Sequence, residues 1–262
     1  LILYKKPGEN KHVNKAELNY IHQDEDDLEQ AAKEDEGPKI GFLKCFTYRQ
    51  TWAFIVGKFM TDGVWWFFLF WTPAYVSDVY GYTSDSPMGM LLIFVLYLIT
   101  MLSVAGGYLP TYFVNKLGMN PYAGRMRAML IFAFFPLLGI FAQPLGSVSP
   151  WLPVILIGIL GAAHQSWSAN IFSTVGDMFP KSAIATVTGI GGMAGGIASF
   201  LINKCSGMLF TYSEQAGSAF TFAGFEGKPA GYMIIFCVCA VAYLVGWVIM
   251  KALVPRYSPI TE

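Results

Sequence analysis

Residues 57–76, GKFMTDGVWWFFLFWTPAYV, form an aromatic segment that is apolar enough to cross a membrane, yet it contains Lys58 and Asp62. The two charges are four residues apart and therefore share one face of a helix. If the helix enters the bilayer near residue 51, the helical rise places Lys58 about 10 Å deep and Asp62 about 16 Å deep, near the midplane. A charge at the centre of the bilayer costs at least about 2.5–3.5 kcal/mol, so such residues face a bundle interior or a wet cavity.

Two interpretations of this pair remain open. In the first, Lys58 and Asp62 form a structural ion pair that neutralises itself, with the lysine stem reaching toward the cytoplasmic surface. In the second, Lys58 is a cationic group that binds an anionic substrate and Asp62 orients it, with Trp65 and Trp66 one turn further along the helix.

The composition predicts an all-α integral membrane protein. Of 262 residues, 55% are hydrophobic and only 13% are charged, against about 25% charged in a soluble domain. The net charge is zero, which gives no reason to expect a nucleic-acid partner. After residue 50 there are six apolar segments, each near the roughly 20 residues needed to span the hydrocarbon: 51–76, 88–114, 127–144, 152–177, 183–210 and 231–254.

The charges divide the chain into three parts. Residues 1–49 hold 18 of the 34 charged side chains, and we expect them to comprise the end of a preceding transmembrane helix, LILYKK, followed by a cytoplasmic linker. Within this part, Asn14 is a candidate N-cap of a short helix, and residues 24–39 have the acidic composition of a solvated linker. Residues 50–254 are the six-helix bundle, and residues 255–262 are a cytoplasmic tail.

Lysine and arginine alternate between the loops and so predict the topology. The N-terminal segment, the second and fourth loops and the C-terminal tail carry these residues, whereas the first and third loops carry none. The positive-inside rule then places both termini in the cytoplasm. The first and fourth spans run in opposite directions, which allows an inverted repeat of three plus three helices.

A second polar cluster, GAAHQSWSANIFSTV at 161–175, lies midway along the fourth span. Imidazole, amide and hydroxyl groups beside an indole suit a sugar-like ligand, which needs hydrogen bonds at its edges and a flat apolar face for stacking. The alternative is hydrogen bonding between helices, a common use of Ser, Asn and Gln in membrane bundles. The candidate substrate-binding side chains of both clusters are Lys58, Asp62, Trp66, His164, Gln165, Ser166, Trp167 and Asn170.

Other motifs point to packing and not to covalent chemistry. Two pairs of glycines have GxxxG spacing: Gly191 with Gly195, and Gly192 with Gly196. For both pairs we favour a role in close helix packing over a role as a hinge. The four cysteines lack metal-binding spacing and are expected to be apolar packing residues, so we expect no metal and no cofactor. An integral-membrane enzyme, the rival class, would need a nucleophile–base pair or a metal cluster at the membrane surface, and we find no HExxH motif, no GxSxG motif and no catalytic arrangement of paired carboxylates.

Residues 106–127, GGYLPTYFVNKLGMNPYAGRMR, resemble the Gly-x-x-x-Asp…Arg-Gly-x-Arg loop motif of the major facilitator superfamily, with Thr111 in place of the aspartate. Three stretches resemble the anion:cation symporter family of that superfamily, specifically its bacterial hexuronate carriers. They are residues 57–76, residues 163–196 and the opening KKPGENKHVNKAELNYI. The resemblance implies helices seven to twelve of a twelve-helix carrier in the bacterial cytoplasmic (inner) membrane, whose N-terminal six-helix half would be a partner.

The resemblance also implies the function. Such carriers move glucuronate or galacturonate together with a cation, with a proton as the first candidate, by alternating access. In related sugar-acid carriers the substrate contacts the positions of Lys58, His164, Ser166 and Trp167, and galactonate-type relatives have glutamine where this chain has Lys58. The coupling acids lie on N-terminal helices. The alternatives are a carrier of galactonate or glucarate and, from another class, a non-transporting membrane scaffold or six-helix channel.

Overall fold

The computed structural model describes residues 7–22 and 40–260. The predicted end of a preceding helix at residues 1–6 and the predicted acidic linker at 24–39 lie outside the described residues. The described N-terminal part contains a 3₁₀ turn, η1 (Pro7–Glu9), and the short helix α1 (Lys15–His22). The side chain of Asn14 accepts a hydrogen bond from the backbone N–H of Glu17 at 2.8 Å, so the predicted N-cap is confirmed.

The bundle that follows is helical, and six of its described helices or helix runs are long and apolar enough to cross a membrane. The prediction of six spans is confirmed; each observed span begins one to six residues before its predicted start, and all but the sixth, which ends at Leu253, also end later than predicted. The single-helix spans are α4 (Arg49–Tyr80), α9 (Trp151–Met178), α10 (Lys181–Ala216), which continues into η4 (Gly217–Ala219), and α11 (Gly227–Leu253).

The second and third spans are each interrupted by a 3₁₀ segment, which the sequence analysis did not predict. In the third span Pro136 lacks a backbone N–H and so breaks the α-helical hydrogen-bond ladder. In the second span the interruption includes the pair Gly106 and Gly107. The segments of the two spans are α5 (Pro87–Thr100), η2 (Met101–Gly107) and α6 (Tyr108–Leu117), then α7 (Pro121–Phe134), η3 (Phe135–Phe141) and α8 (Ala142–Gly146).

Local sequence signals set several helix ends. The side chains of Ser86 and Asn120 cap α5 and α7, and each is followed by a proline at the first helical position. Proline is tolerated there because its missing N–H would have no partner within the helix. Gly118 ends α6 in the left-handed conformation, with φ of 64°, which glycine adopts without a steric cost.

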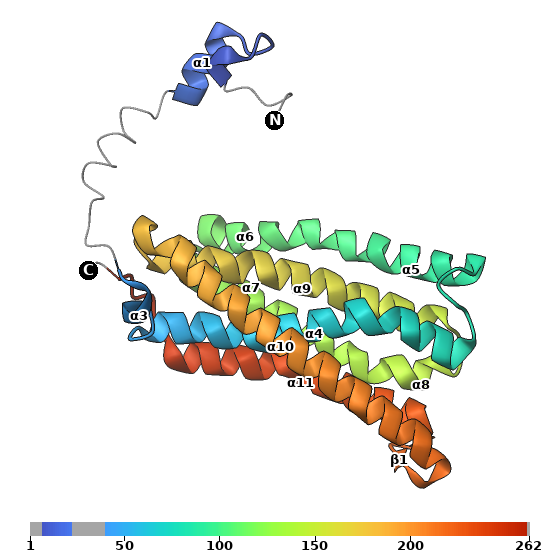
Figure 1. The fold of residues 1–262 in the computed structure, drawn as a ribbon. Helices are drawn as coiled ribbons and strands as arrows, with labels where there is room; N and C mark the ends of the chain where they lie inside the picture. The colour runs from blue at the N-terminus through green and yellow to red at the C-terminus, as the bar shows by residue number, and fades with distance from the viewer. Residues whose placement is uncertain (1–6, 23–39, 261–262) are drawn as a thin grey trace.

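Helix α4 is the central element of the bundle. It packs along α10 and α11 and also contacts α9, which runs in the opposite direction, as the predicted inverted repeat requires (Figure 1). Part of the core is a cluster of aromatic rings from α4, α10 and α11, in which the ring centroids of Phe210 and Tyr232 are 4.2 Å apart. Tyr75 lies 5.0 Å from Tyr232 in the same cluster.

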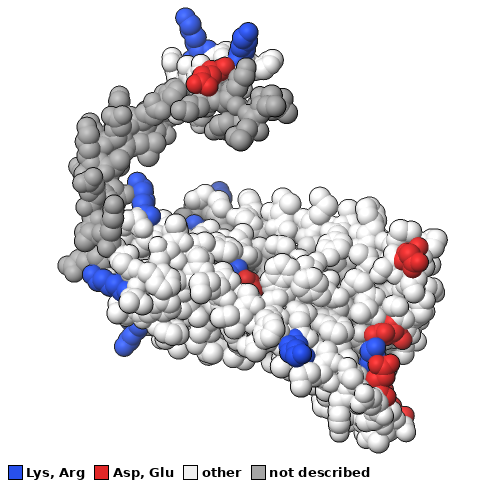
Figure 2. All heavy atoms as spheres, viewed as in Figure 1, with Lys and Arg blue, Asp and Glu red and all other residues white. Residues whose placement is uncertain are grey.

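The two ends of the bundle differ. At one end, called here the terminal end, lie α3 (Phe42–Cys45) and the C-terminal residues (Figure 1). At the opposite end, called the hairpin end, strands β1 (Thr221–Phe222) and β2 (Phe225–Glu226) pair antiparallel, with Thr221 opposite Glu226. In the space-filling view charged side chains gather toward the ends, and few interrupt the white surface between them (Figure 2). That pattern is typical of a membrane-spanning protein.

The predicted C-terminal tail, as far as residue 260, lies against the terminal end of the bundle. The backbone N–H of Ile260 donates to the carbonyl oxygen of Met178 at 2.8 Å, and the hydroxyl of Tyr257 donates to the carbonyl of Asp177 at 3.1 Å. These bonds hold residues 257–260 at the end of α9. Assignment of this end to the cytoplasm stays a prediction.

Cysteine labelling tests that assignment. In a background without the native cysteines, of which Cys205 is exposed, cysteines replacing Ser84 and Ser147 should react with an impermeant thiol reagent added to intact cells. Both positions lie at the hairpin end, whereas exposed Asn115 lies at the terminal end. Asn115→Cys should react only after the cells are opened. Labelling of position 115 from outside would contradict the topology.

Candidate functional site

The two charges in the N-terminal half of α4 form an ion pair. The ammonium of Lys58 lies 2.7 Å from Oδ2 of Asp62. Lys58 is buried, with 4% of its surface exposed, while the Asp62 side chain retains 14% of its exposure. The pair is therefore enclosed by the bundle on most sides, and the carboxylate is its more accessible member.

Two neighbouring helices complete the surroundings of the pair. From α9, the ring of Phe172 lies with its centroid 4.2 Å from the Lys58 ammonium, a cation–π contact. From α10, Gly195 lies directly against the Asp62 carboxylate, and a methyl group at that position would collide with it. The Lys58–Asp62 site is thus built from three helices, and 39% of Phe172 remains exposed beside it.

His164 lies in a second polar group close to the axis of the bundle. Its Nδ1 atom is 2.7 Å from the hydroxyl of Tyr243 on α11, and the same hydroxyl is 3.4 Å from the carbonyl oxygen of Thr61 on α4. The ring of Trp65 stacks on the imidazole with 5.0 Å between centroids. Gly161 leaves room for Trp65 to lie across α9, since a side chain there would meet the indole ring.

Two other candidates on α9, Ser166 and Asn170, point in a different direction from His164. The hydroxyl of Ser166 donates to the carbonyl of Ala162 at 2.9 Å, and the amide of Asn170 donates to the carbonyl of Ser166 at 2.8 Å. Both side chains also reach carbonyls of η2, those of Ser103 and Gly106, at 3.4 and 3.5 Å. These contacts match the open alternative of hydrogen bonding between helices.

Trp167 is fully buried, with 0% exposure, and packs edge-on against Tyr243 with 5.5 Å between centroids. Its indole N–H has no hydrogen-bond partner among the described residues. Gln165 is half-buried on α9, and Trp66 is half-buried on α4, where it stacks on Phe70 at 5.6 Å. The structure therefore brings Lys58 together with Asp62, and His164 close to Trp167 through Tyr243, but it leaves Ser166 and Asn170 against η2.

The sequence analysis missed three residues of the site. They are Phe172, Tyr243 and Trp65, the last in its role as the ring that stacks on His164. Phe172 lies within the quoted polar cluster, but one aromatic residue among many carries no signal of its own. Tyr243 lies in the apolar sixth span, far from His164 in sequence, and only the fold brings its hydroxyl to the imidazole. Buried tyrosine hydroxyls usually need a partner, which was the one available hint.

The two GxxxG pairs have different surroundings. Gly191 and Gly195 face α4, where added side chains would collide with Phe54 and with Asp62, as the packing interpretation expects. Gly192 and Gly196 have no atom close to where a side chain would begin. The second pair therefore lies on an open face of α10.

The described residues offer no group of three or more His, Cys, Asp or Glu side chains that could hold a metal ion. The site combines one ammonium, one carboxylate, one imidazole and several aromatic rings. Such groups can bind and orient an anion without forming a covalent bond to it.

The family profile described as Major Facilitator Superfamily matches residues 1–202. The chain belongs to this superfamily. The hexuronate transporter of Escherichia coli (strain K12) is 26% identical over 213 residues, which cover 80% of this chain and 47% of that protein. The hexuronate transporter of Escherichia coli O157:H7 matches with the same identity and coverage.

The expected family resemblance is thereby confirmed, and the six spans are one half of the superfamily fold. The chain spans about half the length of the curated relatives that it matches. Membership of this superfamily and the six apolar spans indicate a multi-pass membrane protein, and both relatives that it matches are named as transporters.

The stretch that resembles the superfamily loop motif lies at the terminal end of the bundle. Thr111, which replaces the motif aspartate, donates its hydroxyl to the carbonyl of Gly107 in the preceding turn at 3.2 Å. Arg125 of the motif instead pairs with Asp177 at the end of α9, through contacts of 2.7 and 3.4 Å. The carboxylate that binds the arginine therefore comes from a different span.

The glycines of α10 give a direct test of how the ion pair is packed. Gly195→Ala should lower the thermal stability of the purified chain, because its methyl group would displace Asp62, and overpacking costs about 1–3 kcal/mol. Gly196→Ala is the matched control. It should be neutral or stabilising by up to about 1 kcal/mol, since alanine has the higher helix propensity. Equal melting temperatures for the two variants would contradict the packing described here.

Proposed function

We propose that this transporter moves a small organic anion, most specifically a hexuronate such as glucuronate or galacturonate, by symport with a cation, and that the cation is a proton. The observation that carries the proposal is the ammonium of Lys58, buried within a membrane-spanning helix beside Asp62. A buried intramembrane charge supports a functional hypothesis, because membrane insertion disfavours such a charge. The relatives named as hexuronate transporters supply the substrate class.

In the proposed mechanism the ammonium of Lys58 is the binding group. It carries three N–H donors, of which Asp62 takes one, so a substrate carboxylate can be accepted beside the existing pair. The exposed part of Phe172 lies next to this position and offers an apolar surface to the sugar ring. Lys58 would hold the carboxylate or ring hydroxyls, and Asp62 would fix the direction of the ammonium.

Charge balance links substrate binding to the cation. Lys58 and Asp62 together are neutral, so a bound carboxylate adds one uncompensated negative charge to a low-dielectric site. One co-transported proton would restore neutrality before the loaded site crosses the membrane. The transport step itself is a rocking of two helical bundles about the site, with no covalent chemistry. We therefore propose a second six-helix bundle as partner, in a bacterial cytoplasmic membrane.

Substitution of Lys58 tests the role of the ammonium. A charge-assisted hydrogen bond contributes about 1.5–3 kcal/mol, so Lys58→Ala should weaken glucuronate affinity by about 10- to 150-fold. Lys58→Arg should retain a fraction of uptake because its charge remains. Lys58→Gln should weaken hexuronate binding and favour galactonate, because glutamine can hydrogen-bond hydroxyl groups without a charge, as in the galactonate-type relatives. Uptake of labelled glucuronate into cells or liposomes is the measurement.

The double variant Lys58→Ala with Asp62→Ala separates binding from structure. If Lys58 served only to neutralise Asp62, Lys58→Ala alone would express poorly, and the double variant would recover both folding and transport. The proposal expects recovery of folding without recovery of transport. Full uptake by the double variant would rule out Lys58 as the substrate-binding group.

A second test concerns the partner bundle. Alone, the open side of this bundle would place the partly exposed Asp62 next to lipid, where polar groups lack partners. We expect the 262-residue chain in liposomes to show no glucuronate uptake, and co-expression with the N-terminal half of a hexuronate transporter to give uptake. The Lys58→Ala chain, co-expressed in the same way, is the control. Uptake by the purified chain alone would contradict the need for a partner.

A further inference from the structure

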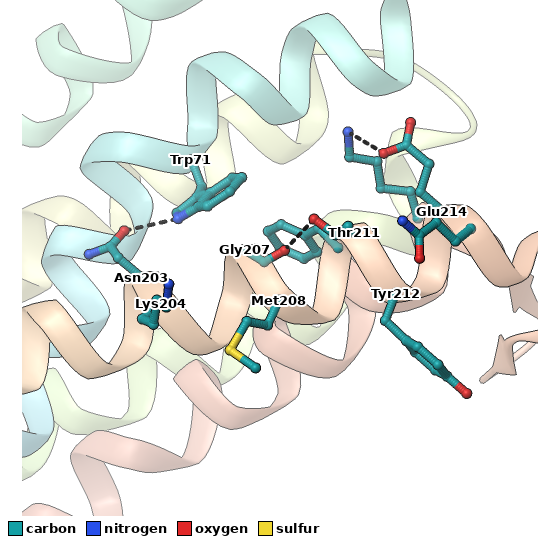
Figure 3. Close-up of a pocket in the computed structure, with 11 residues that line it drawn as sticks. Trp71, Asn203, Lys204, Gly207, Met208, Thr211, Tyr212 and Glu214 are labelled. Atoms are coloured by element: carbon teal, nitrogen blue, oxygen red, sulfur yellow. Dashed lines mark hydrogen bonds and ion pairs between the residues drawn. The ribbon is translucent and has the colours of Figure 1, made fainter.

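A cavity of about 610 Å³ opens between α4 and α10 toward the hairpin end of the bundle, away from Lys58. Its size is within the range of small-molecule sites. Figure 3 shows its polar side chains on the α10 side, among them Asn203, Lys204 and Glu214, with Trp71 of α4 facing them. Gly195 lies against Asp62, so nine residues of helical rise place Lys204 about 14 Å further along α10.

The two lysines around this cavity have different partners. Lys228 forms ion pairs with Asp78 at 3.0 Å and with Glu214 at 3.5 Å. Lys204 is exposed, and no carboxylate in the described part of the chain lies within ion-pair distance of it. The two lysines and the two carboxylates sum to zero, but both carboxylates pair with Lys228, so the ammonium of Lys204 is the group that can bind an anion.

The aromatic wall of the cavity is held in a fixed orientation. The indole N–H of Trp71 donates to the side-chain oxygen of Asn203 at 2.9 Å (Figure 3). The amide of Asn203 donates in turn to the carbonyl of Ser199 at 2.8 Å, which fixes the amide itself. On its other side Trp71 packs edge-on against Phe210, with 4.8 Å between centroids. A ring held by two partners is a preorganised stacking surface for a ligand.

We propose that this cavity is a second binding site for the carboxylated sugar, separate from the Lys58–Asp62 site. The ammonium of Lys204 binds the carboxylate, the Trp71 ring packs against the sugar face, and the hydroxyl of Thr211 accepts hydrogen bonds from ring hydroxyls. The inference rests on the proposed function for its substrate class. The inference adds a position where the anion is held about 14 Å from the Lys58–Asp62 site, toward the hairpin end.

Protection of Lys204 from an amine-reactive reagent tests this site. The 262-residue chain is placed in nanodiscs of zwitterionic lipid and treated with a limiting amount of an acetylating reagent, and mass spectrometry reads each lysine. With glucuronate at about ten times its dissociation constant, acetylation of Lys204 should slow about tenfold, because only the free fraction reacts. Glucose, which lacks the carboxylate, should not slow it. Exposed Lys116 at the terminal end is the internal control and should react equally throughout.

Variants separate this inference from the proposed function. Lys204 should remain protected in Lys58→Ala, or in Lys58→Gln if the alanine variant does not fold, and Trp71→Ala should weaken the protection. Glucuronate binding that depends on Lys58 while Lys204 stays unprotected would overturn the second site alone. Protection of Lys204 with no Lys58-dependent binding would support the second site and count against the central one. In nanodiscs of anionic phosphatidylglycerol, full protection of Lys204 from acetylation without glucuronate would overturn the second site, because a lipid headgroup would then be the ligand.

Discussion

A hydrocarbon medium offers no partner to a charged side chain, and this constraint organises the bundle around Lys58 and Asp62. The lysine is satisfied by a carboxylate on its own helix and by the ring of Phe172 on α9. The carboxylate fits only because Gly195 has no side chain, which sets how closely α10 approaches α4. One ion pair thus fixes the relative positions of three helices.

The same constraint explains the hydrogen bonding of polar side chains elsewhere in the bundle. Ser166 and Asn170 turn toward carbonyls of η2, a segment where the α-helical ladder of the second span is broken. Side chains of a neighbouring helix supply hydrogen bonds at the interruption, as is usual for irregular backbone inside a membrane protein. The polar cluster of α9 therefore has two faces, one that supports η2 and one that carries His164.

Hydropathy and loop chemistry were sufficient to predict the six spans, because each span must be about 20 apolar residues long and the turns carry proline, glycine and capping residues. The i, i+4 pairing of Lys58 with Asp62 could likewise be predicted from spacing alone. The directions of Ser166 and Trp167 could not, since they depend on which helices pack around α9. The interruption at Gly106 had no clear signal either, because glycine pairs are also frequent in intact membrane helices.

The shared hydroxyl of Tyr243 has a consequence for the protonation pattern of His164. A hydroxyl carries a single hydrogen, so when Tyr243 donates it to the carbonyl of Thr61, the contact with Nδ1 requires that the imidazole be the donor. In that tautomer Nε2 of a neutral ring is an acceptor. A displacement of α4 that removed the Thr61 carbonyl would free the hydroxyl to donate to Nδ1, and Nε2 would then carry the hydrogen. Sliding one helix past another would in this way exchange an acceptor for a donor on the far side of the ring, with no change in net charge.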